Sequence, residues 1–102
     1  MNEKSPEIKE RVEIEEDVQK PSMFKVLIYN DDYTTKEFVV EVLVTVFHKS
    51  RESAIRLMFS VHQNGVGVCG VYPLEVAETK VNVVLGKARD HGYPLQLGLE
   101  EE

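Results

Sequence analysis

Most apolar residues of this chain fall into six short segments, some with the spacing of a β-strand and the others with that of an α-helix. A strand buries every second side chain, whereas a helix buries residues three and four apart. None of the segments can bury its apolar side alone, so the six must pack around one core. The chain has 102 residues, which suits a single domain.

Three of these segments are predicted to be strands. Residues 23–29 are apolar and β-branched, and they end at a turn-forming Asn-Asp-Asp triplet. Residues 66–71 are also apolar, and they follow an Asn-Gly pair that tolerates positive φ and is typical of a helix end. Residues 95–99 alternate between Leu and small or polar residues, which predicts a short last strand.

The segment of residues 38–48 is the ambiguous one. Its many valines favour a strand by propensity, but its apolar side chains recur at helical spacing. Thr34 and Glu37, just before it, have the Thr-x-x-Glu spacing of a capping box. The sequence therefore predicts a helix here.

Two further helices are predicted. Ser50 is suited to cap a helix over residues 51–63, and Pro73 suits the first turn of a helix that runs to about residue 90. The side chains expected to face the core are Phe38, Val39, Val42, Leu43, Val46 and Phe47 in the first helix, Ala54, Leu57, Met58 and Val61 in the second, and Val76, Ala77, Val81, Val84 and Ala88 in the third.

The element order is thus β-α-α-β-α-β, and the economical packing is an α+β, two-layer domain with one sheet and its helices on one face. We expect the domain to span residues 23–99. Residues 1–22 are rich in Glu and Lys with scattered apolar residues, which indicates a disordered acidic extension, although a short solvated helix over residues 7–18 is the competing interpretation. Residues 100–102 are all Glu and are expected to be frayed.

The composition narrows the classes of function. The net charge of -6 and the absence of a basic stripe argue against nucleic-acid binding. No apolar run is long enough to span a bilayer, and the first residues resemble neither a signal nor a transit peptide, so a cytoplasmic location with no membrane partner is expected. The single cysteine, Cys69, cannot form an internal disulfide and is expected to be a buried small hydrophobe.

No catalytic motif is present, and the three histidines have no metal-like spacing, so we predict no enzyme activity, no cofactor and no metal. Two features could still bind a ligand. Asn30, Asp31 and Asp32 form a loop that is either a turn with a helix cap or a receptor for a cation such as an ammonium group.

The second feature is a helix face that carries Met58, Val61 and His62 at spacings of three and four. It is either a core stripe with one satisfied histidine or the wall of an apolar pocket with a polar rim. Spacing alone does not show whether this face meets the Asn-Asp-Asp loop.

Five separated motifs together resemble the signature of ClpS, the adaptor of the bacterial Clp AAA+ protease. They are Asn30-Asp31-Asp32-Tyr33-Thr34 with Glu37-Phe38-Val39, Leu57-Met58-x-x-Val61-His62, Cys69-Gly70-Val71, Glu75-Val76-Ala77-Glu78-Thr79-Lys80-Val81, and Pro94-Leu95. The resemblance covers Pro21 to Leu99 without an evident gap.

The resemblance implies a small domain with three antiparallel strands and three helices and no catalytic activity. It implies binding of N-end rule substrates, which are proteins that begin with Leu, Phe, Tyr or Trp. It also implies delivery of these substrates to the N-terminal domain of a ClpA-type unfoldase, with the N-terminal extension needed for delivery after binding.

The resemblance also implies roles for single residues. Those that would grip the substrate's α-amino group are Asn30, Asp31, Asp32 and His62. Those that would line the side-chain pocket are Val39, Met58, Val61 and Leu95, with Thr34, Thr35 and Lys36 at the rim. Those that would dock on the unfoldase are Tyr33, Glu75 and Lys80.

One departure from the family and two alternatives remain. The family usually has Pro-Met where this chain has Thr35-Lys36, and the methionine guards the pocket against β-branched side chains. The first alternative is a generic interaction module that docks on a AAA+ N-terminal domain through residues 75–80 without recognising N-terminal residues. The second is a small hydrolase that uses Asp31 or Asp32 with His62.

Overall fold

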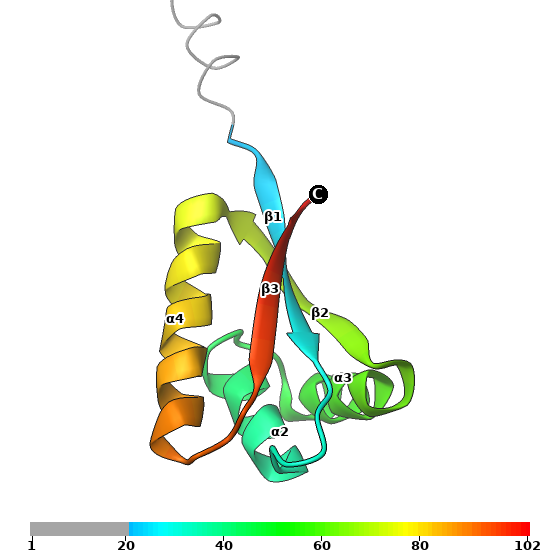
Figure 1. The fold of residues 1–102 in the computed structure, drawn as a ribbon. Coiled ribbons are helices and arrows are strands. Elements are labelled where there is room, and N and C mark those ends of the chain that lie inside the picture. The colour runs from blue at the N-terminus through cyan, green and yellow to red at the C-terminus, as the bar shows by residue number, and fades with distance from the viewer. Residues whose placement is uncertain (1–20) are drawn as a thin grey trace, which may run out of the picture.

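The structure, a computed structural model, describes residues 21–102, so most of the predicted extension (residues 1–22) lies outside the described residues. The elements follow one another as β1 (Met23–Tyr29), α2 (Lys36–Thr45), α3 (Arg51–Asn64), β2 (Val66–Pro73), α4 (Leu74–Asp90) and β3 (Gln96–Glu101). The predicted order β-α-α-β-α-β and the α+β class are confirmed (Figure 1).

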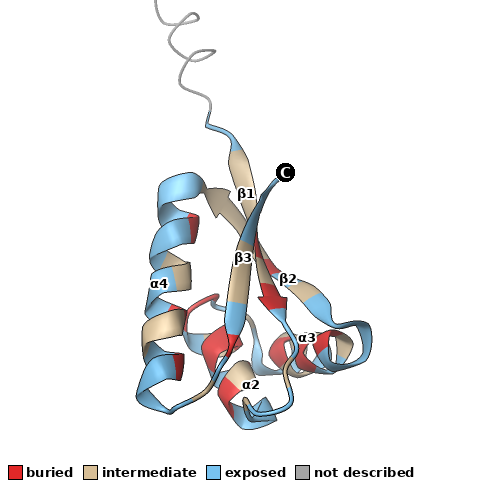
Figure 2. Cartoon of the chain, viewed as in Figure 1, coloured by how far each residue is buried: buried red, intermediate tan, exposed pale blue. Residues whose placement is uncertain are grey.

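The three strands form one antiparallel sheet in the order β2-β1-β3, so β1 is paired on both sides. Along β1, Val26 and Ile28 are fully buried while Leu27 between them is only half-buried. Helix α4 contacts all three strands, α3 packs on β2, and α2 packs on α3. Figure 2 shows the buried residues gathered where the helices and the sheet face one another, which is the two-layer arrangement.

A β-bulge interrupts the pairing of β1 with β2. Val26 lies opposite Gly70, whereas the next residue, Leu27, lies opposite Val68, so Cys69 is an extra residue on β2. The side chain of Cys69 is only 1% exposed and belongs to the core. The prediction that Cys69 is a buried small hydrophobe is therefore confirmed.

Helix α2 is confirmed as a helix, but both of its predicted ends were wrong. Thr35, not Thr34, caps its N-terminus, because the Thr35 hydroxyl oxygen accepts a hydrogen bond from the Phe38 amide at 3.1 Å. The helix then ends at Thr45 instead of reaching His48, whose left-handed φ of 59° is incompatible with a continuing helix.

The other two helices follow their predictions closely. The Ser50 hydroxyl oxygen accepts a hydrogen bond from the Ser53 amide at 3.1 Å and caps α3, as expected. In α4, Ala77, Val84 and Ala88 are buried, but Val76, which was also predicted to face the core, is 42% exposed because it lies beside the buried stripe. Within residues 21–102, no helix combines the length and the apolar character needed to cross a membrane.

The acidic C-terminus is not frayed as expected. Strand β3 continues to Glu101, with Glu100 opposite Lys25 and Glu101 opposite Phe24, and the Glu102 amide donates to the Met23 carbonyl at 2.9 Å. Strand β1 offers hydrogen-bonding groups along its whole length, and the backbone of these glutamates satisfies them whatever the side chains are.

Cys69 is expected to resist iodoacetamide in the folded protein. Burial raises the pKa of its thiol from 9.0 to about 12, and the positive charge of Lys49 offsets this only in part. The reactive thiolate is therefore scarce, and the reagent has no access to it. Alkylation followed by mass spectrometry should show labelling only in denaturant, and rapid labelling in buffer would contradict the buried position.

Candidate functional site

The pairing of β1 with β2 brings the end of the first strand to the end of α3. The last residue of β1, Tyr29, lies opposite Val66, the first residue of β2. Gly65, in the left-handed conformation at φ 90°, ends α3, and its carbonyl accepts a hydrogen bond from the Asn30 amide at 3.0 Å. The last turn of α3, which carries Val61 and His62, is thereby held beside the first residue of the loop.

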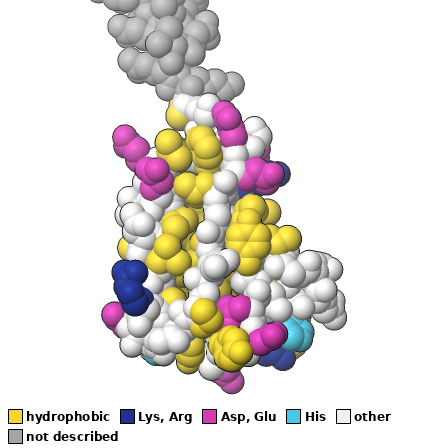
Figure 3. All heavy atoms as spheres, viewed as in Figure 1, with side chains coloured by type: hydrophobic (Ala, Val, Ile, Leu, Met, Phe, Trp, Pro, Cys, Tyr) yellow, Lys and Arg dark blue, Asp and Glu magenta, His cyan; other side chains and the backbone are white. Residues whose placement is uncertain are grey.

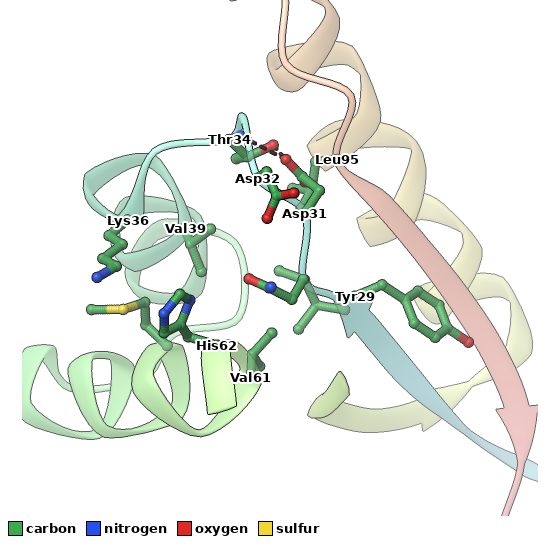
Figure 4. A pocket seen from close by; sticks show the side chains of 12 residues that line it. Tyr29, Asp31, Asp32, Thr34, Lys36, Val39, Val61, His62 and Leu95 are labelled. Carbon is green, nitrogen blue, oxygen red and sulfur yellow. Dashed lines mark hydrogen bonds between the residues drawn. The ribbon is translucent and has the colours of Figure 1, made fainter. Parts of the chain in front are cut away.

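The loop between β1 and α2 is organised by one carboxylate. Oδ1 of Asp31 accepts hydrogen bonds from the amides of Tyr33 and Thr34, at 2.8 and 2.7 Å, and Oδ2 accepts one from the Thr34 hydroxyl at 2.8 Å (Figure 4). Burial by itself would raise the pKa of Asp31, but these hydrogen bonds outweigh it and hold the pKa below its ordinary value of 3.8. Asp31 thus keeps its charge and fixes the shape of the loop.

Asp32 differs from its neighbour. Its side chain is exposed, and it accepts no hydrogen bond from the residues that the structure describes. In Figure 4 its carboxylate and the imidazole of His62 lie on two sides of one hollow, with Val39 between them. Asp32 therefore has free acceptor positions facing a space that other side chains enclose.

That hollow is a cavity of about 180 Å³ between the loop, α2, α3 and the residue before β3. Sites for drug-sized ligands span roughly 300–1,000 Å³, so this cavity is sized for one side chain and its attached polar group. The residues that line it are Ile28, Tyr29, Asn30, Asp31, Asp32, Thr34, Lys36, Val39, Met58, Val61, His62 and Leu95.

The cavity has an apolar wall and a polar end. The apolar wall consists of Val39, which is half-buried, and of Met58, Val61 and Leu95, which are nearly completely buried. The polar end consists of Asn30, Asp32 and His62, whose side chains are exposed. Figure 3 shows acidic, histidine and apolar side chains close together on the surface at this end of the molecule.

The cavity brings together nearly every residue predicted for the site. All four residues predicted to bind an amino group and all four predicted for the pocket line it, and so do Thr34 and Lys36 of the predicted rim. Thr35 does not line it, because this residue caps α2 and its hydroxyl donates to the Tyr93 hydroxyl at 3.4 Å.

Sequence reasoning missed two residues of the lining, Ile28 and Tyr29. Ile28 is fully buried, and the ring of Tyr29 points away from the cavity and over β3 (Figure 4). A Cβ atom at Gly98 would lie 3.1 Å from the Tyr29 hydroxyl oxygen, which shows how closely this ring covers β3. The only signal for these two residues was their position directly before the loop.

The apolar wall is supported from behind by a glycine. A Cβ atom at Gly67 would lie 2.6 Å from Cγ2 of Val61 and 3.1 Å from Cδ1 of Leu57. Distances below 3.0 Å are essentially never seen for real Cβ atoms, so β2 can approach α3 this closely only because residue 67 has no side chain.

The three residues predicted to dock on an unfoldase do not form one compact patch. Tyr33 is 77% exposed on the loop, at the end of the molecule that holds the cavity. Glu75 is exposed in the first turn of α4, and Met23 opposite Pro73 places that turn at the other end of β1 (Figure 1).

The third of these residues, Lys80, is held by the fold. Its ammonium group donates to the Val46 carbonyl at 2.7 Å and lies 5.1 Å from the Tyr72 ring centroid and 5.9 Å from the Phe47 ring centroid. Val46 follows the last residue of α2, so Lys80 caps that helix from α4. The side chain is half-buried, and its charge is directed into the molecule.

Among residues 21–102, no group of three or more His, Cys, Asp or Glu side chains could hold a metal ion. What the cavity offers is carboxylate, amide and imidazole acceptors beside an apolar wall, a combination suited to binding a cationic group attached to an apolar one.

A family model described as "ATP-dependent Clp protease adaptor protein ClpS" matches residues 19–98. The chain belongs to the ClpS family. It is 60% identical over 90 residues to the ATP-dependent Clp protease adapter protein ClpS of Caulobacter vibrioides, covering 88% of this chain and 83% of that protein. The ClpS of Nitratidesulfovibrio vulgaris is 57% identical over 88 residues, covering 86% of this chain and 88% of that protein.

A solved structure is similar as well. It is that of Agrobacterium tumefaciens ClpS2 bound to L-phenylalaninamide, with a TM-score of 0.78 and 37% sequence identity, covering 81% of this chain and all of that one. The ClpS resemblance predicted from the sequence is therefore confirmed, together with the fold that it implies. The chain is an adaptor of a Clp protease.

The contribution of Asp31 to stability is expected to depend on pH. Its pKa in the folded protein lies below 3.8, so its ionised form stabilises the fold above that pH, and the effect is lost as the pH falls through the folded pKa. Asp31→Asn should therefore lower the free energy of unfolding at pH 7, and the difference from wild type should shrink in acid. Urea denaturation at both pH values measures this, with Asp32→Asn as the matched control. An equal loss at both pH values would contradict it.

Removal of the Lys80 ammonium is expected to destabilise the protein. Lys80→Met keeps an apolar stem but leaves the Val46 carbonyl without its donor, so we expect about 1–3 kcal/mol less stability. Thermal and urea denaturation provide the measurement. Glu75→Gln, exposed in the first turn of the same helix, should cost much less, because it removes only a favourable charge near the helix N-terminus. A Lys80→Met protein as stable as wild type would show that the contact contributes nothing.

Proposed function

We propose that this ClpS-family chain binds the free α-amino group and the large hydrophobic first residue, Leu, Phe, Tyr or Trp, of N-end rule substrates, without cleaving them. The observation that carries the proposal is that one cavity combines an apolar wall with carboxylate, amide and imidazole groups at its polar end. The first side chain would contact the apolar wall, and the ammonium group would bind at the polar end.

Only the N-terminus of a protein combines a charged ammonium group with an adjacent side chain. An internal residue presents an uncharged amide next to its side chain, whereas a first residue presents a charged ammonium group that donates three hydrogen bonds. The acceptors of the polar end are exposed and hydrated in the free protein. A ligand without the ammonium group would displace that water without replacing its hydrogen bonds, which disfavours it.

Asp31 and Asp32 have different parts in the proposal. Asp32 has free acceptor positions and would bind the ammonium group together with Asn30 and His62. Three hydrogen bonds from the loop already occupy much of the Asp31 carboxylate, so Asp31 would contribute mainly its charge and the shape of the loop. Its lowered pKa keeps that charge at neutral pH.

The interactions are strong enough for this task. Burying a Leu or Phe side chain contributes about 1.5–3 kcal/mol. Each hydrogen bond that involves a charged group contributes roughly 1.5–3 kcal/mol. After the costs of association, binding of about -8 kcal/mol, a micromolar Kd, is within reach.

The ligand of the similar structure supports this choice of substrate. L-phenylalaninamide, bound by Agrobacterium tumefaciens ClpS2, has a free α-amino group, an aromatic side chain and an amide in place of the carboxylate. It therefore has the chemistry of a Phe at the start of a peptide.

For delivery, we propose a cytoplasmic ClpA-type AAA+ unfoldase whose N-terminal domain contacts two separate regions, Tyr33 on the loop and Glu75 in the first turn of α4. Leu74 and Val76, each more than 40% exposed, provide apolar contact area beside Glu75. Lys80 would act there by fixing α4 against α2, since its charge is directed into the molecule. The N-terminal extension would act after binding.

Binding of a peptide that begins with Leu is expected to require its free amino group. Fluorescence anisotropy with a C-terminally labelled peptide should give a Kd near the micromolar range, and acetylation of the N-terminus should raise it about tenfold or more. Asp32→Ala and His62→Ala should each raise the Kd about tenfold and leave the circular dichroism spectrum unchanged.

The outcomes separate the alternatives. Equal affinity for the free and the acetylated peptide would contradict the proposal and favour an interaction module that uses residues 75–80 alone. Cleavage of the peptide by the protein alone would instead favour a hydrolase. Loss of the folded spectrum in the Asp32 or His62 variant would show that the residue is structural.

A further inference from the structure

A second cavity lies beside the first, and the proposed function leaves it unused. It has a volume of about 340 Å³ and lies between α2 and the first three turns of α3. Two of its walls, Lys36 and Met58, are also walls of the first cavity. The residues that line it are Lys36, Glu37, Val40, Arg51, Ile55, Met58 and Phe59.

Lys36 forms the partition between the two cavities. It is the first residue of α2, and its ammonium group lies 5.6 Å from the centroid of the Phe59 ring on α3. Its side chain therefore reaches from one helix towards the other, and Figure 4 shows it beside Val39 on the α2 side of the first cavity. Lys36 thus borders both cavities, which lie side by side.

The second cavity is mainly apolar. Val40 and Met58 are buried and Ile55 is half-buried, but Phe59 is 48% exposed. An exposed Phe at the mouth of an apolar groove is a feature of contact sites for apolar groups. Lys36 and Arg51 supply two positive charges against the single negative charge of Glu37, in a protein whose net charge is -6.

We propose that this second cavity is a subsite for an apolar side chain at the second or third residue of the bound peptide. The inference rests on the proposed function, since it requires the first residue of the peptide to be bound in the first cavity. Each extended residue advances the chain by about 3.3–3.6 Å, so a residue directly after the first reaches a cavity that shares walls with the anchor. Lys36 and Arg51 disfavour Lys or Arg at that residue by charge repulsion.

The test is a peptide series that begins with Leu and varies the second and third residues among Phe, Ala and Lys, with anisotropy as the readout. Phe at one of these positions should lower the Kd about fivefold relative to Ala, because an open groove recovers only part of the burial energy of the ring. Lys there should raise the Kd. Phe59→Ala should abolish the lower Kd of the Phe peptides. It should leave the Kd unchanged for the peptide that has Ala at both the second and the third position.

Val83→Ala is the matched control, because Val83 is similarly exposed, at 43%, but lies on α4 and lines neither cavity. If wild type binds the Phe peptides no more tightly than the Ala peptides, the subsite is overturned. The same holds if Phe59→Ala still prefers the Phe peptides. Neither result affects the role of the first cavity. Acetylated versions of the same peptides test the proposed function separately. If they bind as well as the free peptides, the proposed function fails, and the subsite fails with it.

Discussion

The antiparallel pairing of β1 with β2 is the interaction on which the site depends. It places the turn after α3 next to the start of the loop, and the hydrogen bond from the Asn30 amide to the Gly65 carbonyl joins the two. The polar end of the cavity combines Asn30 and Asp32 of the loop with His62 of the last turn of α3, at least 30 residues further along the chain. Any change that shifted the register between β1 and β2 would separate Asp32 from His62 and abolish the cavity.

The adjacent carboxylates of Asp31 and Asp32 serve different purposes in one loop: the first fixes its conformation and the second keeps free acceptor positions. Asp31 is turned towards its own loop, where amides and a hydroxyl bind it, and Asp32 is turned towards the cavity. Local sequence suggested two alternatives, a structural turn or a cation receptor. The structure assigns the turn to Asp31, and it leaves Asp32 with the free acceptor positions that a receptor requires.

Periodicity and caps are local properties, and they were sufficient for the elements. Most of the cavity lining was predicted only through the resemblance to ClpS, because spacing alone does not show that the loop meets α3. The first turn of α2 could not be predicted correctly, since Asp31 binds both the amide and the hydroxyl of Thr34 and the helix begins one residue later. The position of Lys80 depends on α2 and α4 meeting in three dimensions. Ile28 and the second cavity likewise arise from packing between segments, which spacing along one segment does not reveal.

Gly67 determines the size of the cavity without lining it. Its missing side chain lets β2 press directly against Val61, and Val61 forms part of the apolar wall. A methyl group at residue 67 would force Val61 or β2 to shift, and Val61 borders a space of only about 180 Å³. The dimensions of this cavity therefore depend on how closely β2 packs against α3, although β2 contributes no residue to the lining.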